Sequence, residues 1–307
     1  MDTRIILFAA GVLAMAACSS NDPEVQGNVG EIRLYTEVSA PTRAADNSVA
    51  LQDEQFAVNT DISVMVTDKG DQNATTLVQY DLTTYRADGS GGLTPMTTQY
   101  YPASGNSVEV CAYHPAGATS TFSVAADQRA TGDYRASDLM WAQLESINKN
   151  TDAAGRMLTF HHLCSKIIVR LVKGSGVTDA EIAAAKITLE GGTGDENRLI
   201  MGGTFGAGVG TLIADANVTG SITIATDAGT ASHAAVVIPQ NMGGKKITVA
   251  LGGGEQSYTF PALTAFEKGT KYVYTVTVNK AELVVTASIE NWTTPDGWVD
   301  PTPNLKI

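Results

Sequence analysis

The pattern of apolar and polar residues changes phase in the middle of the chain, between Leu158 and Val172. Leu158 and Phe160 alternate with polar residues in one phase, whereas the apolar residues from Ile167 onward alternate in the other. Alternation with period two indicates a strand with one buried face. A phase change inside such a run requires a bulge, a bend or the meeting of two strands, so we interpret this stretch as the join between two β domains.

The N-terminal half shows the same period. Residues 31–38 place Ile, Leu, Thr and Val on one face and Glu, Arg and Tyr on the other, which predicts a half-buried antiparallel strand. Further strands are expected at residues 62–66 and 77–85, and the glycine-rich residues 88–92 are expected to form a turn after the second of them.

The half after the join predicts short strands between Gly-rich turns. Their apolar positions are Ile187, Leu189, Ile222, Ile224, Val236 and Ile238. Strands at a spacing of about 8 to 12 residues predict β-sandwiches. The pattern favours a single helix, at residues 178–185, because Thr178 and Glu181 have the spacing of a capping box. Residues 295–307 contain three prolines and are expected to lie outside the second core.

Length and charge narrow the function classes. A chain of 307 residues accommodates two domains of ordinary size, and 43% hydrophobic residues supply packed cores. The formal net charge of −12 argues against a nucleic-acid partner and against an electrostatic attraction to anionic lipid.

The N-terminus has the features of a targeting segment. Arg4 precedes an apolar run over residues 5–17, which is too short to span a bilayer comfortably and suits the core of a signal peptide. Small residues directly before Cys18 resemble a bacterial lipoprotein box, so residues 1–17 are the predicted signal peptide and Cys18 the predicted lipidation site. The alternative is an ordinary signal peptide cleaved near Ala17. An acylated Cys18 would tether the chain to a membrane without spanning it.

Cys111 and Cys164 lie inside apolar strand segments, where cysteine often packs as a small hydrophobic residue. We expect them to be mainly buried free thiols. Because the chain is predicted to be exported, a disulfide between them is the alternative.

No active site emerges from the sequence. His161 and His162 are adjacent, so a strand directs them to opposite faces, and no metal-binding motif occurs. Residues 202–210 are glycine-rich without nucleotide-binding spacing, which favours hairpin glycines. Asp138 is expected to cap a turn. Trp141, Trp292 and Trp298 could line a sugar site, although packing is favoured for Trp141 and Trp292, which lie in or beside apolar segments. We therefore predict no enzyme activity, no metal and no cofactor.

Several motifs resemble those of one family. Residues 158–171, LTFHHLCSKIIVRL, resemble the mid-chain strand of the Bacteroides-type fimbrillins, the type V pilin proteins. In the same order, a Tyr-Pro turn and strand at residues 101–115 and a Ser-Asp-Leu-Met segment at residues 137–140 resemble the first domain of that family. The segments 236–240, 266–278 and 289–292 resemble its second domain.

The resemblance implies a fold and a maturation route. It implies an all-β chain of two tandem transthyretin-like Greek-key β-sandwich domains, with boundaries at residues 44–157 and 158–293 and a tail at residues 294–307. A Thr-Arg-Ala motif in the first loop of fimbrillins is cut by an Arg-specific protease, and Arg43 and Ala44 occupy that place here. Residues 18–43 would then be a lipidated propeptide that includes a removable strand.

These expectations together predict a fimbrial subunit at the cell outer membrane. Its partners would be other fimbrial subunits joined by a donor strand, an Arg-specific maturation protease, and a host or bacterial surface receptor. Contact with the membrane would be through the lipid anchor alone. No nucleic-acid partner is expected. Either residues 283–289 or the tail from Pro295 would supply the donor strand. The alternative function is a monomeric surface lipoprotein that binds carbohydrate.

Overall fold

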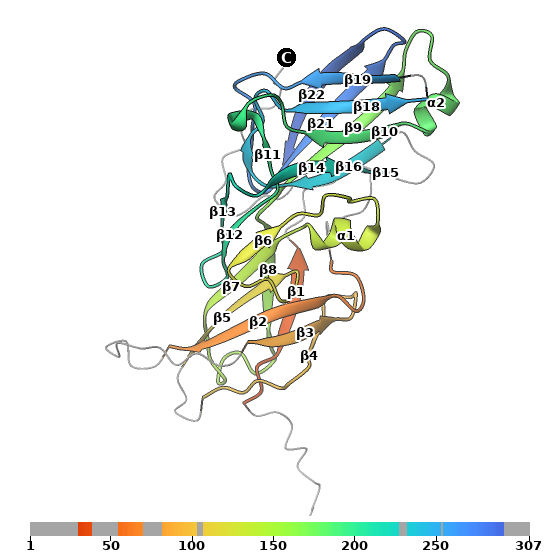
Figure 1. Cartoon of the computed structure of the whole chain (residues 1–307). Coiled ribbons are helices and arrows are strands. Elements are labelled where there is room, and N and C mark those ends of the chain that lie inside the picture. Colours follow the sequence, from red (N-terminus) through yellow and green to blue (C-terminus); the bar gives the residue numbers. More distant parts are fainter. Residues whose placement is uncertain are drawn as a thin grey trace, which may run out of the picture.

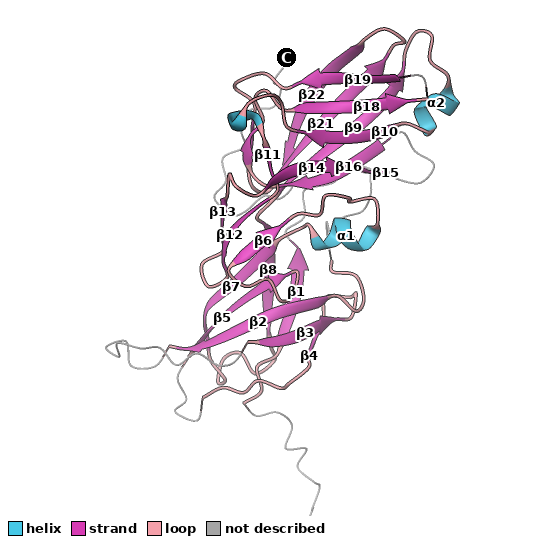
Figure 2. Ribbon diagram, in the orientation of Figure 1, coloured by secondary structure: helices cyan, strands magenta, loops and turns pink. Residues whose placement is uncertain are grey.

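The computed structural model describes residues 30–38, 55–69, 82–102, 107–226, 232–252 and 254–291. These residues form strands with only short helices, which confirms the all-β class. Figures 1 and 2 show two lobes stacked end to end. The transthyretin-like Greek-key topology of each lobe stays a prediction.

A seven-stranded sheet forms the first lobe, in the order β1-β8-β7-β5-β2-β3-β4. Its strands are β1 (Leu34–Val38), β2 (Asp61–Asp68), β3 (Thr83–Ala87), β4 (Leu93–Pro95), β5 (Val108–His114), β7 (Met140–Ile147) and β8 (Arg156–His162). Alternate residues of β2 and β5 are fully buried in one apolar core, because period-two side chains share a face. The predicted strand at residues 77–85 is present from Thr83, and its earlier residues lie outside the described part of the chain.

The direction of β1 differs from the prediction. β1 pairs in parallel with β8, with Leu34 opposite Arg156 and Val38 opposite Phe160, so the expected antiparallel pairing is wrong. Alternation reports which face of a strand is buried and contains no information about the direction of its neighbour.

Two facing five-stranded sheets form the second lobe. One has the order β15-β16-β9-β21-β22, with β9 (Ser165–Lys173), β15 (Ala225–Thr226), β16 (Ser232–Val237), β21 (Thr270–Val278) and β22 (Leu283–Asn291). The other has the order β11-β14-β10-β18-β19, with β10 (Lys186–Glu190), β11 (Leu199–Ile200), β14 (Thr219–Thr223), β18 (Lys246–Leu251) and β19 (Gly254–Thr259). The pair β17 (Gln240–Asn241) and β20 (Ala265–Phe266) is separate.

The chain passes from the first lobe to the second at Leu163 and Cys164. The phase change found in the sequence is therefore the meeting of two strands, β8 and β9. This passage falls a few residues after the boundary predicted at 157 and 158. The prediction assigned β8 to the second domain, whereas β8 pairs with β1 and β7 in the first sheet.

A hairpin from the second half of the chain reaches the outer face of the first lobe. It consists of β12 (Gly202–Gly206) and β13 (Thr211–Ala214), which confirms the predicted hairpin glycines, and β12 also pairs with β6 (Thr121–Ser123). The indole of Trp141 donates a 2.7 Å hydrogen bond to the carbonyl of Ala207 and lies against Gly210, where a Cβ would collide with the ring. Figure 1 shows this hairpin at the waist between the lobes.

The helices only partly follow the prediction. α2 (Asp179–Ala183) has the complete capping box of Thr178 and Glu181 that the sequence indicated. A short 3₁₀ turn (Asp195–Asn197) and α1 (Thr131–Ala136) were not expected. α1 has no side-chain cap and contains a glycine, so its local signal is weak, and its buried Tyr134 packs in the core of the second lobe.

We predict that Trp141→Ala lowers the free energy of unfolding by about 2 kcal/mol, because it removes both a partly buried ring and the hydrogen bond to the hairpin. Urea unfolding followed by circular dichroism measures this change. Trp141→Phe, which keeps an aromatic ring without the indole N–H, should lose about half as much. An unchanged urea midpoint for Trp141→Ala would show that the hairpin contact contributes no stability.

Candidate functional site: the groove of the first strand and the junction pocket

The inner face of the first strand fills a groove in the first lobe. Ile32 and Leu34 are 1% exposed and Thr36 and Val38 are 3% exposed, so every second side chain is buried. Its three aliphatic side chains join the core that contains Phe56, Leu158 and Phe160. Burying the three aliphatic side chains contributes on the order of 5 kcal/mol.

Hydrogen bonds hold this segment along both of its edges. On one edge it pairs in parallel with β8. On the other, the amide of Thr36 donates to Gly91 at 2.7 Å, and the amide of Ile32 donates to Gln99 at 2.8 Å. The order of the sheet begins with β1 and ends with β4. Gly91 and Gln99 lie on either side of β4, so these bonds bring the two ends of the sheet together.

The predicted processing residues lie outside the described part of the chain. Cys18 precedes the described residues, and Arg43 and Ala44 follow β1, which ends at Val38. Lipidation and cleavage at these positions therefore stay predictions. The structure does place the strand between them, and that strand has the alternation that the sequence indicated.

Cys111 and Cys164 are both buried free thiols. The Cys111 thiol lies under the hairpin, 3.6 Å from the carbonyl oxygen of Gly208. Burial, followed by the nearby carboxylate of Glu109, raises the pKa of Cys111 to about 12. Burial also raises the pKa of Cys164. Both thiols are consequently in their unreactive, protonated form at neutral pH.

A histidine–carboxylate pair is buried where the two lobes meet. The Nδ1 atom of His162 lies 2.7 Å from Asp138 Oδ1, and both side chains are 0% exposed. Asp138 is therefore not the turn cap that was expected. His161 points to the opposite face and is only half-buried, as adjacent strand residues should be. The pair serves packing at the join, where the amide of Leu163 also donates to the carbonyl of Leu139.

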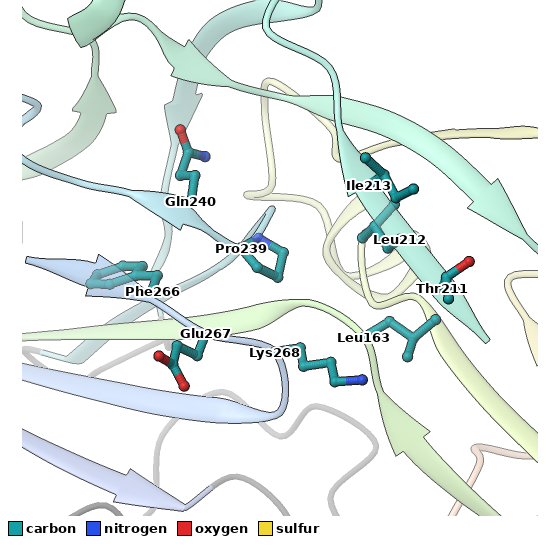
Figure 3. Close-up of a pocket in the computed structure, with 9 residues that line it drawn as sticks. All are labelled: Leu163, Thr211, Leu212, Ile213, Pro239, Gln240, Phe266, Glu267 and Lys268. Carbon is teal, nitrogen blue, oxygen red and sulfur yellow. The ribbon is translucent and has the colours of Figure 1, made fainter.

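An open pocket of about 580 Å³ lies beside this join. Figure 3 shows its wall, which is formed by Leu163, Thr211, Leu212, Ile213, Pro239, Gln240, Phe266, Glu267 and Lys268. Most of the wall is apolar. The amide of Gln240 is already used, because its Nε2 donates to Ile200 and its Oε1 accepts from the amide of Ile200. No sequence pattern predicts this pocket, because its residues come from four separate segments.

Neither the groove of the first strand nor the junction pocket resembles a catalytic or metal centre. Within the described ranges, no group of three or more His, Cys, Asp or Glu side chains is arranged to hold a metal ion. The helices of the same ranges are all too short or too polar to cross a bilayer. Trp141 is covered by the hairpin and presents no open platform for a sugar, whereas Trp292 and Trp298 lie outside the described residues.

Comparison with known proteins decides the family. The sequence profile described as fimbrillin-like matches residues 42–292, which is most of the chain. The chain belongs to the fimbrillin-like family. The resemblance stated from the sequence motifs is thereby confirmed.

Bacteroides species contain proteins similar to this fimbrillin. A candidate fimbrium subunit from Bacteroides uniformis, Fim1C, is 26% identical over 211 residues, which span 65% of this chain and 66% of that protein. The crystal structure of a candidate cell-adhesion protein from Bacteroides uniformis has 21% identity and a TM-score of 0.66, covering 87% of this chain and 100% of the other. One from Bacteroides ovatus has 19% identity and a TM-score of 0.65, covering 87% and 99%. These two structures support the fold.

Burial of histidines makes the stability of this fimbrillin depend on pH. Burial lowers the pKa of His233 to about 4 and also lowers the pKa of His114 and His161 below the ordinary value. The folded state therefore favours the neutral rings. Above about pH 6.5 these rings are neutral in both states, whereas below it the unfolded chain binds protons that the folded chain does not.

We predict that the free energy of unfolding falls between pH 6.5 and 5, with His233 alone accounting for on the order of 1–2 kcal/mol. Urea unfolding at a series of pH values measures this slope. His233→Gln should reduce the slope, whatever its effect on stability at pH 7.5. A slope that is the same in the variant would show that His233 does not titrate in this range.

Proposed function

We propose that this fimbrillin is a structural subunit of a cell-surface fimbria. It is exported as a lipoprotein through Cys18, matured by an Arg-specific protease after Arg43, and assembled by strand exchange. The observation that supports this most is the position of β1. Its buried face and both of its edges hold the first lobe together, yet its only covalent link to the lobe runs through residues 39–54, which contain Arg43.

Cleavage after Arg43 converts β1 from part of the chain into a bound peptide. If that peptide leaves, the lobe has an apolar groove flanked by the unpaired edges of β8 and of residues 91–99. Unpaired strand edges are templates for another strand, and a buried row of side chains selects which strand fits. Filling the groove from a neighbouring subunit restores both the hydrophobic contacts and the ladder hydrogen bonds.

The groove favours β22 over the tail as the donor. In β1 and the residues just before it the buried row is Ile32, Leu34, Thr36 and Val38, with its smallest side chain in the third place. The row of β22 that packs on the second core is Leu283, Val285, Ala287 and Ile289, which also has its smallest side chain in the third place. The tail from Pro295 has three prolines, and each lacks the N–H that a central strand donates. Donation from one subunit to the next does not close on itself and yields a filament.

The remaining parts of the proposal follow from the family. Other fimbrial subunits are the assembly partners, and a host or bacterial surface receptor is the target of adhesion. The subunit resides at the cell outer membrane, attached by lipid alone before maturation, and then in the fimbrium. The competing function is a monomeric lipoprotein that binds carbohydrate. Saccharide binding by the uncut protein, without filament formation after cleavage, would favour that function.

We predict that an Arg43→Ala precursor remains monomeric when it is treated with an Arg-specific protease. The wild-type precursor should shift to a series of oligomers that resist mild detergent, because cleavage frees β1 to be replaced. Size-exclusion chromatography and gel electrophoresis measure this shift. A matched control is Arg129→Ala, because Arg129 is an exposed arginine paired with Asp127 and lies far from β1 in the sequence. Wild type that is cut after Arg43 and stays monomeric, with β1 still bound, contradicts strand exchange.

Lipid attachment is tested separately. We predict that Cys18→Ala abolishes metabolic labelling with palmitate and releases the protein from the membrane fraction, because the thiol of Cys18 is the acceptor. Cys111→Ala should label normally, since that thiol is buried. Undiminished labelling of Cys18→Ala would show that another residue carries the lipid.

A further inference from the structure

The buried row of the first strand contains a polar side chain. Thr36 lies between Leu34 and Val38 on the inner face and is 3% exposed. In the parallel register with β8 it lies opposite Leu158, which is 0% exposed. Residues opposite one another in paired strands share a face of the sheet, so the side chain of Thr36 enters the same apolar core as Leu158.

The hydroxyl of Thr36 is buried and has no hydrogen-bond partner among the described residues. Its backbone amide donates to Gly91, so the main chain is satisfied while the side-chain oxygen is not. Several other buried hydroxyls of the chain are hydrogen-bonded; they include those of Ser63, Ser137, Ser165 and Thr248. A buried hydroxyl without a partner loses its bonds to water and gains none in exchange, which weakens the folded state.

The outer face of β1 is better satisfied than the inner one. The hydroxyl of Thr159 on β8 donates to the carboxylate of Glu37 at 2.7 Å. The hydroxyl of Tyr35 donates to the carbonyl of Ala154 at 3.4 Å. These contacts favour one register of β1 against β8, and that register fixes the Thr36 hydroxyl in the middle of the buried row.

We propose that Thr36 makes β1 a weaker occupant of its own groove than an incoming strand that has a small apolar side chain at the same place. This role rests on the proposed strand exchange and gives the exchange a direction. In the uncut chain, the covalent link holds β1 at a high effective concentration beside the groove and offsets the unpaired hydroxyl. Cleavage after Arg43 removes that advantage, so a strand without a hydroxyl opposite Leu158 binds more tightly. Ala287, in the third place of the β22 row, meets this requirement.

The first experiment measures the cost of the hydroxyl in the uncut full chain, where no strand is exchanged. Thr36→Val keeps the shape of the side chain and should raise the ratio of folded to unfolded protein about fivefold or more in urea unfolding. Thr36→Ala should likewise be more stable than Thr36→Ser, a second pair that differs only by the hydroxyl.

The matched control is Thr94→Val, because Thr94 is exposed on β4 of the same lobe. It should change the ratio by no more than about twofold. Should neither pair at position 36 show the gain, the hydroxyl costs nothing in the groove and the role of Thr36 is overturned, whether or not strands exchange.

The second experiment measures replacement of the strand. The full-length precursor is cut after Arg43, and a fluorescent peptide of residues 30–38 is added as the competing strand. The peptide that carries Thr36→Val should displace the bound strand at a concentration about fivefold or more below that of the native peptide, as fluorescence anisotropy measures. A peptide that carries Leu34→Thr, with a second hydroxyl in the row, should require more than the native peptide.

The outcomes separate this role from the proposed function. Equal concentrations for the native and Thr36→Val peptides would overturn the role of Thr36 and leave strand exchange standing. If no peptide enters the groove, strand exchange itself is contradicted and the role of Thr36 in it fails as well. The first experiment then still reports whether the buried hydroxyl destabilises the first lobe.

Discussion

The first lobe depends on a strand that is bonded along both edges. In the sheet order β1-β8-β7-β5-β2-β3-β4, β1 pairs with β8 on one side and bonds to residues 91 and 99 on the other. Without it, the buried faces of β8 and of the segment after β3 would both be open to water. The strand therefore contributes to the stability of the lobe through both its buried face and its two bonded edges. If the chain is cut after Arg43 as proposed, this strand alone becomes a separate peptide.

The elements with strong local signals were predictable, and those set by distant neighbours were not. The phase change at His161 and His162, the capping box of Thr178 and the hairpin glycines each follow from a pattern a few residues long. The parallel direction of β1 does not, because it depends on a strand more than a hundred residues away. The assignment of β8 to the second domain failed for the same reason, since Phe160 alternates identically whichever sheet it joins.

The candidate site likewise has a part that the sequence predicts and a part that it does not. The sequence indicated the strand that fills the groove and the residues expected to be processed on either side of it. It could not indicate the junction pocket, because Leu163, the β13 hairpin, Pro239 and Lys268 meet only after both lobes and the waist are formed. Asp138 is a further case. A lone aspartate before an apolar segment is usually a turn residue, and only the folded chain brings it to His162.

The contacts at the waist would support the first lobe if β1 left it, as the proposed strand exchange requires. The hairpin of β12 and β13 touches β7 through Trp141 and β5 through Cys111, on the face of the sheet opposite to the groove. Residues 122–139 pack into the core of the second lobe, which is separate from the core that β1 completes. Removing β1 therefore exposes one apolar core while the strands that line it stay attached to an intact neighbour. A groove that keeps its form when empty binds a strand with a smaller loss of conformational entropy, so the second lobe and the waist would favour the strand exchange proposed for the first lobe.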